Sequence, residues 1–129
     1  MDYLDTNVFI YWLAAHRLYG DRAMNIIKKV EGGDKAVTSC LTVVQCHWLL
    51  EEYAKGYSYH TLISILSAVK NLMIVPLSQK ELIAADEASK QYDLDLEDAI
   101  HYATAVAYKC SAICSNDADF DCTDLKRKF

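Results

Sequence analysis

The chain has 129 residues, of which 53% are hydrophobic, so it is about the size of one domain and apolar enough to bury a core. Glycine and proline are scarce, at four and one residues, and no composition shift marks a linker, which predicts a single domain over residues 1–129. The formal net charge of −5 excludes binding of nucleic acid through a strongly basic surface, so any contact with RNA must use local charges or bound cations.

The longer apolar stretches are interrupted by polar side chains before they reach the length of a membrane span, and no basic leader precedes the first apolar run. We therefore expect a cytoplasmic protein without a membrane contact. The five cysteines form an odd set without a C-x-x-C pair, which argues against a zinc site and a disulfide framework and favours reduced thiols. They are Cys40, Cys46, Cys110, Cys114 and Cys122.

The first third of the chain alternates short strands with helices. A strand at residues 3–4 ends at the polar triplet 5–7, and a helix follows over residues 8–15. A second helix begins at Asp21 and ends at a pair of glycines, which supply a left-handed stop. Residues 36–38 form the next predicted strand.

Serine caps then open two further helices. Ser39 is predicted to cap a helix with an apolar face, and Ser58 is predicted to cap the next one. A strand at residues 73–75 ends before a proline. The expected inward-facing residues are Leu41, Val44, Trp48 and Leu49 in the first helix and Leu62, Ile65, Leu66 and Val69 in the second.

The last third of the chain predicts two helices and a final strand. Ser78 and Glu81 form a capping box, and the helix that it opens is expected to turn Leu82, Ala85, Ser89 and Tyr92 inward. Another helix runs from Asp95 to about Lys109, and residues 112–114 are the last clear strand. Strands separated by helices, without hairpin signals, predict a three-layer α/β/α fold with a central parallel sheet.

Four aspartates follow predicted strands or begin a predicted helix. Asp5 follows the first strand, Asp98 lies in a first helical turn, and Asp117 and Asp119 follow the last strand. Taken singly, these residues are explained as a helix cap, a dipole-stabilising residue and a polar turn. In a parallel sheet, however, the ligand site lies beyond the carboxyl ends of the strands, where these carboxylates would converge and repel one another. The convergence predicts a Mg²⁺ or Mn²⁺ site.

Four segments also share the order and spacing of a known family. They read LDTNV at 4–8, TSCLT at 38–42, DAIHYATA at 98–105 and SNDADF at 115–120, and they resemble the successive signature blocks of PIN domains, including VapC-like toxins. The resemblance implies that Asp5, Asp98 and Asp117 are the core acidic ligands and that Asp119 is accessory. Asn7 and Ser115 would be polar supports around them.

The resemblance implies a metal-dependent endoribonuclease that hydrolyses RNA phosphodiester bonds, as the toxin of a toxin–antitoxin pair. An antitoxin partner would occlude the acidic pocket, and we expect a homodimer. His101 lies one turn after Asp98, so it either faces the site or packs inside. Two further groups of residues each have two interpretations. The basic residues Arg17, Arg22, Lys28 and Lys29 form an RNA-facing or merely solvated surface, and Tyr11, Trp12 and Tyr19 form an exposed or a buried aromatic group.

One position departs from the family pattern. PIN domains usually carry a glutamate three residues after the threonine that matches Thr42, and this chain has Gln45 there. The amide removes a negative charge, which weakens the expected metal site and leaves open a degenerate, non-catalytic binding module. Glu51 and Glu52, further along the same predicted helix, are read as a solvated face rather than substitutes. A receiver-type domain is disfavoured, because residues 76–78 after the middle strand contain no phosphoacceptor aspartate.

Overall fold

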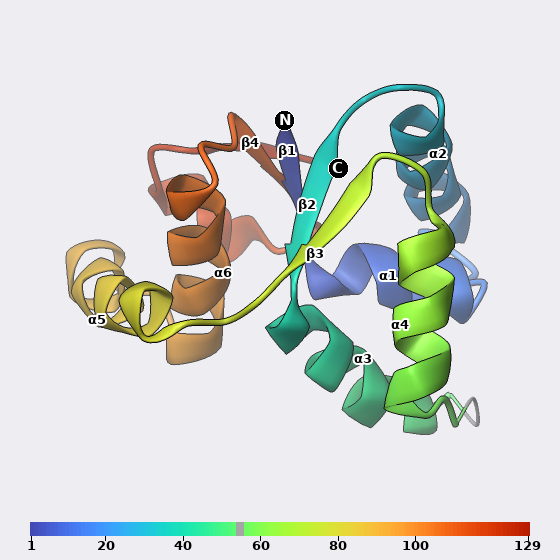
Figure 1. The fold of residues 1–129 in the computed structure, drawn as a ribbon. Helices are drawn as coiled ribbons and strands as arrows, with labels where there is room; N and C mark the ends of the chain where they lie inside the picture. Colours follow the sequence, from blue (N-terminus) through green and yellow to red (C-terminus); the bar gives the residue numbers. More distant parts are fainter. Residues whose placement is uncertain (54–55) are drawn as a thin grey trace.

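The computed structural model describes residues 1–53 and 56–129, and its centre is a five-stranded sheet in which every pair of neighbours is parallel (Figure 1). The strand order is β3-β2-β1-β4-β5. The strands are β1 (Asp2–Leu4), β2 (Ala36–Ser39), β3 (Leu72–Val75), β4 (Ala112–Cys114) and β5 (Lys126–Lys128). The predicted three-layer α/β/α fold with a central parallel sheet is confirmed.

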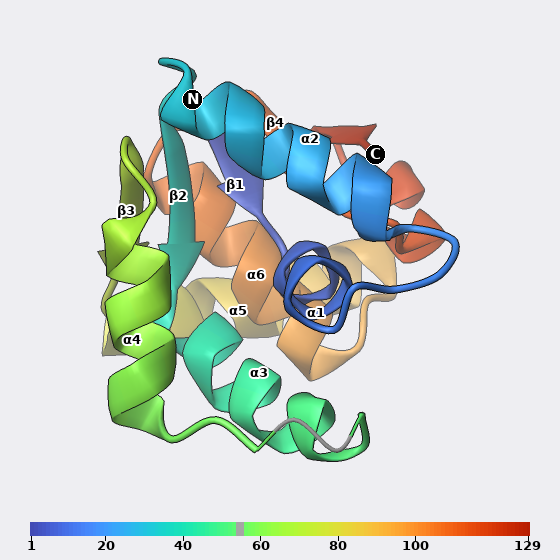
Figure 2. The same ribbon diagram turned by 90° about the vertical axis from the view of Figure 1, so that its right-hand side faces the viewer.

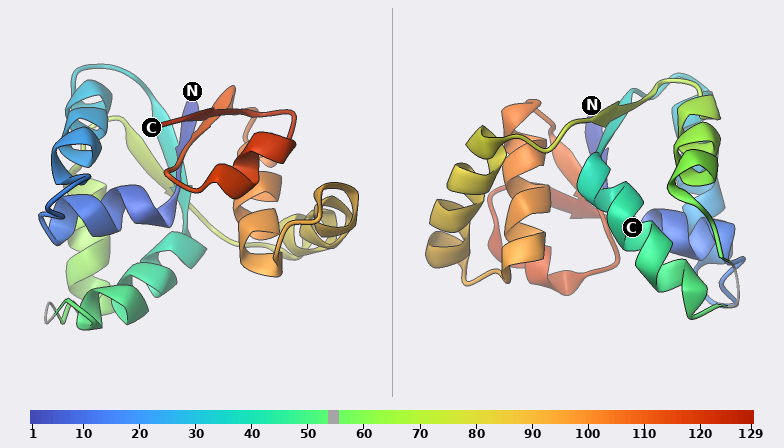
Figure 3. Two further views of the ribbon diagram at one scale, coloured as in Figure 1. Left: turned by 180° about the vertical axis from the view of Figure 1, so that it is seen from behind. Right: turned by 60° about the horizontal axis from the view of Figure 1, so that its bottom comes forward.

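Helices cover both faces of this sheet. Helices α1 to α4 lie on one face and α5 and α6 on the other, as Figures 2 and 3 show from the side and from behind. A 3₁₀ helix, η1, follows β4 and leads into β5. The helices are α1 (Thr6–Leu13), α2 (Gly20–Glu31), α3 (Cys40–Glu51), α4 (Tyr59–Ala68), α5 (Gln79–Tyr92), α6 (Leu96–Ala107) and η1 (Ala118–Cys122).

Two hydrophobic clusters fill the spaces between the layers. Leu4 and Ala36 belong to the cluster under α1 to α4, whereas their strand neighbours Tyr3 and Val37 belong to the cluster under α5 and α6. This alternation follows from the two-residue period of a strand, which turns successive side chains to opposite faces. A sheet covered on both faces therefore favours strands that are apolar at successive positions, as β4 is, whereas β2 ends in the buried polar residues Thr38 and Ser39.

The predicted inward face of α3 is wrong. Trp48 is 57% exposed and Leu49 is 40% exposed, whereas Val43, Cys46 and Leu50 are buried. Apolar residues occur on nearly every side of this helix, so its hydrophobic pattern does not single out one face. The face that is buried also carries polar groups that belong to the candidate site, including Thr42 and Gln45.

The predicted face of α5 needs a smaller correction. Leu82 is 45% exposed, while Ala85 and Ala88 are buried against α6. Small side chains line this contact on both helices, so they allow the helices to approach closely and turn the larger leucine outward. The capping box of Ser78 and Glu81 is confirmed.

Two other elements differ from the sequence prediction. Ser39 occupies the cap position of α3 but makes no capping hydrogen bond, and its hydroxyl instead lies 3.0 Å from that of Tyr3. Strand β5 was not predicted at all, because its sequence is Lys-Arg-Lys at the edge of the sheet, where a strand needs no apolar face. Among the described residues, no helix is both long enough and apolar enough to cross a membrane.

Candidate metal centre

The candidate site lies where the strand order reverses. Strand β1 pairs with β2, the next strand in the chain, on one side and with β4 on the other side. In open parallel sheets such a reversal leaves a crevice beyond the carboxyl ends of the two strands. Asp5 follows β1 and Ser115 follows β4, and the backbone N–H of Asp5 donates to the carbonyl of Cys114 at 3.0 Å. The two strand ends therefore meet at one edge.

Asp5 is held by donors on both of its carboxylate oxygens. It is the N-cap of α1, and its Oδ1 accepts from the backbone N–H of Thr6 at 2.7 Å. Its Oδ2 accepts from Asn7 Nδ2 at 2.9 Å and from Ser115 Oγ at 2.6 Å. The side chain is buried, so these charge-assisted bonds fix it in one position at the crevice. Asn7 also donates to Ser115 Oγ at 2.9 Å.

Three further carboxylates converge beside Asp5. Asp98, Asp117 and Asp119 each offer an oxygen, and these oxygens all lie within 4.8 Å of one another, a spacing that suits ligands of a single hard cation. Asp98 lies in the first turn of α6, and Asp117 caps η1 by accepting from the backbone N–H of Asp119 at 2.9 Å. Asp5 is not part of this group of three.

The convergence of carboxylates changes the pKa of the Asp98 carboxyl group. Burial and, in decreasing order of size, the charges of Asp95, Asp117, Asp5 and Asp119 together raise its pKa to about 7. A carboxyl group in such a field gives up its proton when a cation neutralises its neighbours. The donor set is entirely oxygen, which matches Mg²⁺ or Mn²⁺ rather than Zn²⁺.

His101 and Gln45 lie behind the carboxylates, inside the protein. His101 Nε2 lies 2.7 Å from Gln45 Oε1 and 3.6 Å from Asp5 Oδ1, and its Nδ1 lies 2.7 Å from the hydroxyl of Tyr3. Burial lowers the pKa of His101, although the nearby acids oppose this. The histidine is therefore both packed and in contact with the site. Gln45 is turned toward Thr6 and His101.

Three residues at the site were missed by the sequence prediction. Glu97 accepts from Gln45 Nε2 at 3.1 Å, and Thr6 Oγ1 donates to Gln45 Oε1 at 2.5 Å. Arg127 of β5 donates to the carbonyl of Ser115 at 3.2 Å and forms an ion pair with Asp121 of η1. The only signals in the sequence were the neighbours of these residues. Thr6 directly follows Asp5, and Glu97 directly precedes Asp98. Nothing in the sequence indicated Arg127, because β5 itself was not predicted.

Glu51, the last residue of α3, and Glu52, its C-cap, are exposed, as expected for a solvated face. Tyr11, Trp12 and Tyr19 are half-buried, and Tyr11 and Tyr19 pack on each other and on Phe129, so they do not form the exposed alternative. The four basic residues named above, Arg17, Arg22, Lys28 and Lys29, are exposed.

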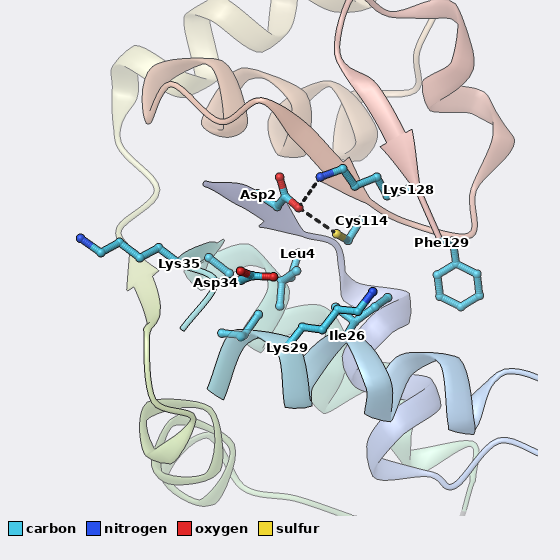
Figure 4. A pocket seen from close by; sticks show the side chains of 11 residues that line it. Asp2, Leu4, Ile26, Lys29, Asp34, Lys35, Cys114, Lys128 and Phe129 are labelled. Atoms are coloured by element: carbon cyan, nitrogen blue, oxygen red, sulfur yellow. Dashed lines mark hydrogen bonds and ion pairs between the residues drawn. The ribbon is translucent and has the colours of Figure 1, made fainter. Parts of the chain in front are cut away.

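A pocket of about 280 Å³ lies apart from the carboxylates, between α2 and strands β1, β4 and β5 (Figure 4). Lys128 and Asp2 form an ion pair at 2.8 Å across its wall, and Cys114 Sγ lies 3.9 Å from the same carboxylate oxygen. The lining contains none of the four aspartates of the candidate centre. Among the described residues, the carboxylates combine converging charge with a raised pKa, which makes them the candidate centre rather than this pocket.

Several solved structures have the same fold. VapC20 of Mycobacterium tuberculosis, described as a toxin that cleaves the sarcin-ricin loop, has a TM-score of 0.76 and 17% identity, over 97% of this chain and 96% of that one. VapBC2 of Rickettsia felis, solved with a DNA fragment from its promoter, has a TM-score of 0.74 and 17% identity, over 99% and 98% of the two chains. A toxin–antitoxin complex of Klebsiella pneumoniae gives 0.65 and 22%, over 93% and 90%.

A search of curated protein sequences found no match. The family comparison is more direct, because the family model described as "PIN domain" matches residues 3–126, which is nearly the whole chain. The structural neighbours include toxins of toxin–antitoxin systems, and the sheet, the crevice and the acidic residues lie within the matched range. The chain belongs to the PIN domain family.

Proposed function

We propose that this protein is a Mg²⁺- or Mn²⁺-dependent endoribonuclease and the toxin of a toxin–antitoxin pair. The observation that carries the proposal is the set of three carboxylate oxygens, from Asp98, Asp117 and Asp119, within 4.8 Å of one another at the crevice beside Asp5. Family membership supports the same reading, since PIN domains bind divalent metal ions. VapC20, which shares the fold, is described as a toxin that cleaves the sarcin-ricin loop.

The residues around the crevice have different proposed roles. Asp98, Asp117 and Asp119 would hold the cation, with Asp5 as the further acidic ligand, fixed by Asn7 and Ser115. When bound there, a divalent ion would lower the pKa of an attacking water and neutralise charge that develops on the phosphate. Because the ligand carboxylates lie at strand and helix ends, they are held in place before substrate binds.

A bound cation would also explain how a protein with a net negative charge can bind RNA. A carboxylate cluster by itself repels the RNA backbone, whereas a divalent ion among the carboxylates attracts a phosphate. Of the four exposed basic residues, Arg17 and Arg22 would supply local positive charge for the flanking phosphates, whereas Lys29 lines the separate pocket between α2 and the sheet.

The proposed partners are an antitoxin and a second copy of the chain. The structural neighbour from Klebsiella pneumoniae was solved as a toxin–antitoxin complex. An antitoxin that inserts a basic side chain or a peptide into the crevice would inhibit cleavage. Sedimentation of the purified protein, in a buffer that resembles the cytoplasm, should give a homodimer. A monomer at all protein concentrations would contradict this.

The test is cleavage of a mixed, structured RNA with Mn²⁺, with Mg²⁺ and with EDTA. Cleavage should need a metal ion and should be lost in Asp98→Asn and in Asp5→Asn. Asp86→Asn is the matched control, because Asp86 is an exposed aspartate on α5 that pairs with Lys90. Equal cleavage by Asp98→Asn and the control would overturn the proposal.

The second candidate is a binding module with the PIN fold that does not cut RNA, and the observation in its favour is Gln45 at the position of the usual glutamate. It predicts that the wild-type protein binds RNA but leaves it intact with either metal ion. The same assay separates the two functions when it is combined with a measurement of RNA binding.

A further inference from the structure

The amide of Gln45 is held from both ends. Its Nε2 donates to Glu97 Oε2 at 3.1 Å, while its Oε1 accepts from Thr6 Oγ1 at 2.5 Å and lies 2.7 Å from His101 Nε2. Turning the amide over would set its oxygen against the Glu97 carboxylate, which can only accept. Glu97 therefore determines which way Gln45 faces.

The fixed amide in turn determines which nitrogen of neutral His101 carries the proton. Nε2 faces two acceptors, Gln45 Oε1 at 2.7 Å and Asp5 Oδ1 at 3.6 Å, so the proton lies on Nε2. Nδ1 is then the acceptor for the Tyr3 hydroxyl at 2.7 Å, which uses the single proton of that hydroxyl and leaves Ser39 Oγ, at 3.0 Å, as the donor to the Tyr3 oxygen. An unbroken series of donors and acceptors thus runs from Glu97 through Gln45 and His101 to Tyr3, directly behind Asp5.

We propose that Gln45 and Glu97 act as one unit, in which Glu97 supplies the negative charge that a glutamate at position 45 would bring and Gln45 is a positioning residue. The amide holds His101 and Thr6 in place against Asp5, and the carboxylate stays at the rim of the crevice, next to Asp98 in the first turn of α6. The inference rests on the proposed nuclease function, since it explains how the chain makes up for one missing acid at the metal centre.

The competing interpretation is that Gln45 is a lost ligand and Glu97 an ordinary solvated side chain. The two interpretations differ in what a glutamate at position 45 would do. If Gln45 is a lost ligand, Gln45→Glu restores the site without cost. If Gln45 and Glu97 are a unit, Gln45→Glu brings two carboxylates together where a 3.1 Å hydrogen bond was, and Glu97→Gln in the same chain relieves the repulsion.

The experiment compares the wild type, Gln45→Glu, Glu97→Gln and the double exchange, all prepared without metal. We expect Gln45→Glu to lower Tm and the double exchange to bring it back close to the wild-type value. We expect Glu97→Gln to weaken Mn²⁺ binding, measured by calorimetry, by roughly tenfold or more. Glu87→Gln is the matched control, because it removes the same charge from an exposed position on α5. Nitrogen NMR of the wild type should show His101 with its proton on Nε2.

Three results would overturn the inference: additive effects of the two exchanges on Tm, Mn²⁺ affinity in Glu97→Gln equal to that of the control, or a proton on Nδ1 of His101. Asp98→Asn separates this failure from failure of the proposed function. If Asp98→Asn also leaves Mn²⁺ affinity unchanged, the metal centre itself is wrong. If Asp98→Asn abolishes binding and Glu97→Gln does not affect it, only the unit of Gln45 and Glu97 is wrong.

Discussion

Ser115 Oγ donates to Asp5 Oδ2 at 2.6 Å and so joins two residues that are 110 positions apart. The same hydroxyl oxygen accepts from the backbone N–H of Asp117 at 3.0 Å and from Asn7 Nδ2 at 2.9 Å. One serine therefore ties the end of β1 to the end of β4 and to the start of η1, which places Asp5 and Asp117 relative to each other.

Ser115→Ala removes these three contacts while leaving all four aspartates in place. Loss of a buried hydrogen-bonding group costs about 1–3 kcal/mol of unfolding free energy, and loss of a partner that orients a ligand lowers metal affinity or activity roughly 10–100-fold. Urea unfolding and RNA cleavage measure the two effects. Ser111→Ala is the control, because Ser111 is exposed. A variant with wild-type cleavage would show that Asp5 keeps its place without the serine.

Asp98 predicts an unusual dependence of stability on pH in the absence of metal. Its pKa is raised from 3.8 to about 7 in the folded protein, so its contribution to stability is fully present below about pH 4 and is lost as the pH rises through 7. Asp98→Asn removes this loss. In EDTA at pH 8 the variant should be more stable than the wild type by on the order of 1–3 kcal/mol, less at pH 5.

Metal binding should show the opposite trend for the same reason. The Asp98 carboxyl group must release its proton to act as a ligand, so Mn²⁺ affinity of the wild type should rise as the pH increases from 5 to 8. Calorimetry at several pH values measures this. Both predictions depend on the raised pKa of Asp98. It would be contradicted if the difference in unfolding free energy between Asp98→Asn and the wild type, measured in EDTA, stayed constant from pH 5 to pH 8.

The corrected face of α3 can be tested with two adjacent leucines. Leu50 is fully buried and Leu49 is 40% exposed, so the same substitution should have very different costs at the two positions. Leu50→Ala should lower the unfolding free energy by about 2–5 kcal/mol, and Leu49→Ala by about 0.5 kcal/mol. Urea unfolding at one pH and without metal gives both values. Equal costs would contradict the burial of Leu50 over Leu49, and a larger cost at Leu49 would mean that α3 packs through the face first expected.

The five free cysteines should fall into two classes of reactivity. Cys46, Cys110 and Cys114 are buried, and burial raises the pKa of their thiols to about 12, 11 and 12, whereas Cys40 and Cys122 are exposed. A thiol reagent such as DTNB should titrate two thiols rapidly in the native protein and all five in denaturant, because the thiolate is the reactive form. Rapid reaction of a third thiol would show that one of the buried positions opens readily.

Much of the fold could be predicted from the sequence, because local chemistry and long-range packing agree in most elements. Ser58 caps α4 by accepting from the backbone N–H of Thr61, and Ser78 and Glu81 form the capping box of α5, both as expected. The strands at Tyr3, Val37 and Ile113 are apolar at successive positions, which is the pattern of a sheet covered on both faces. These signals are read within a few residues of the element that they define.

The parts that were missed depend on contacts between distant segments. Strand β5 is basic and is held at the sheet edge by pairing with β4, and Arg127 takes its role from Asp121 and from the carbonyl of Ser115. Glu97 was passed over because nothing in the sequence indicates that α3 brings Gln45 within 3.1 Å of it. The outward turn of Trp48 likewise follows from how α3 packs, since its pattern offers several apolar faces.

The four aspartates come from both sides of the sheet, and this has a consequence for how the protein opens. Asp5 caps α1 in the layer formed by α1 to α4, while Asp98 lies in the first turn of α6 in the opposite layer. An ion shared between them would fasten two layers whose hydrophobic clusters are otherwise separate. Backbone amides in α1 and α6 would then exchange with solvent more slowly and as one cooperative unit, so that occupancy of the crevice is felt through the whole thickness of the molecule.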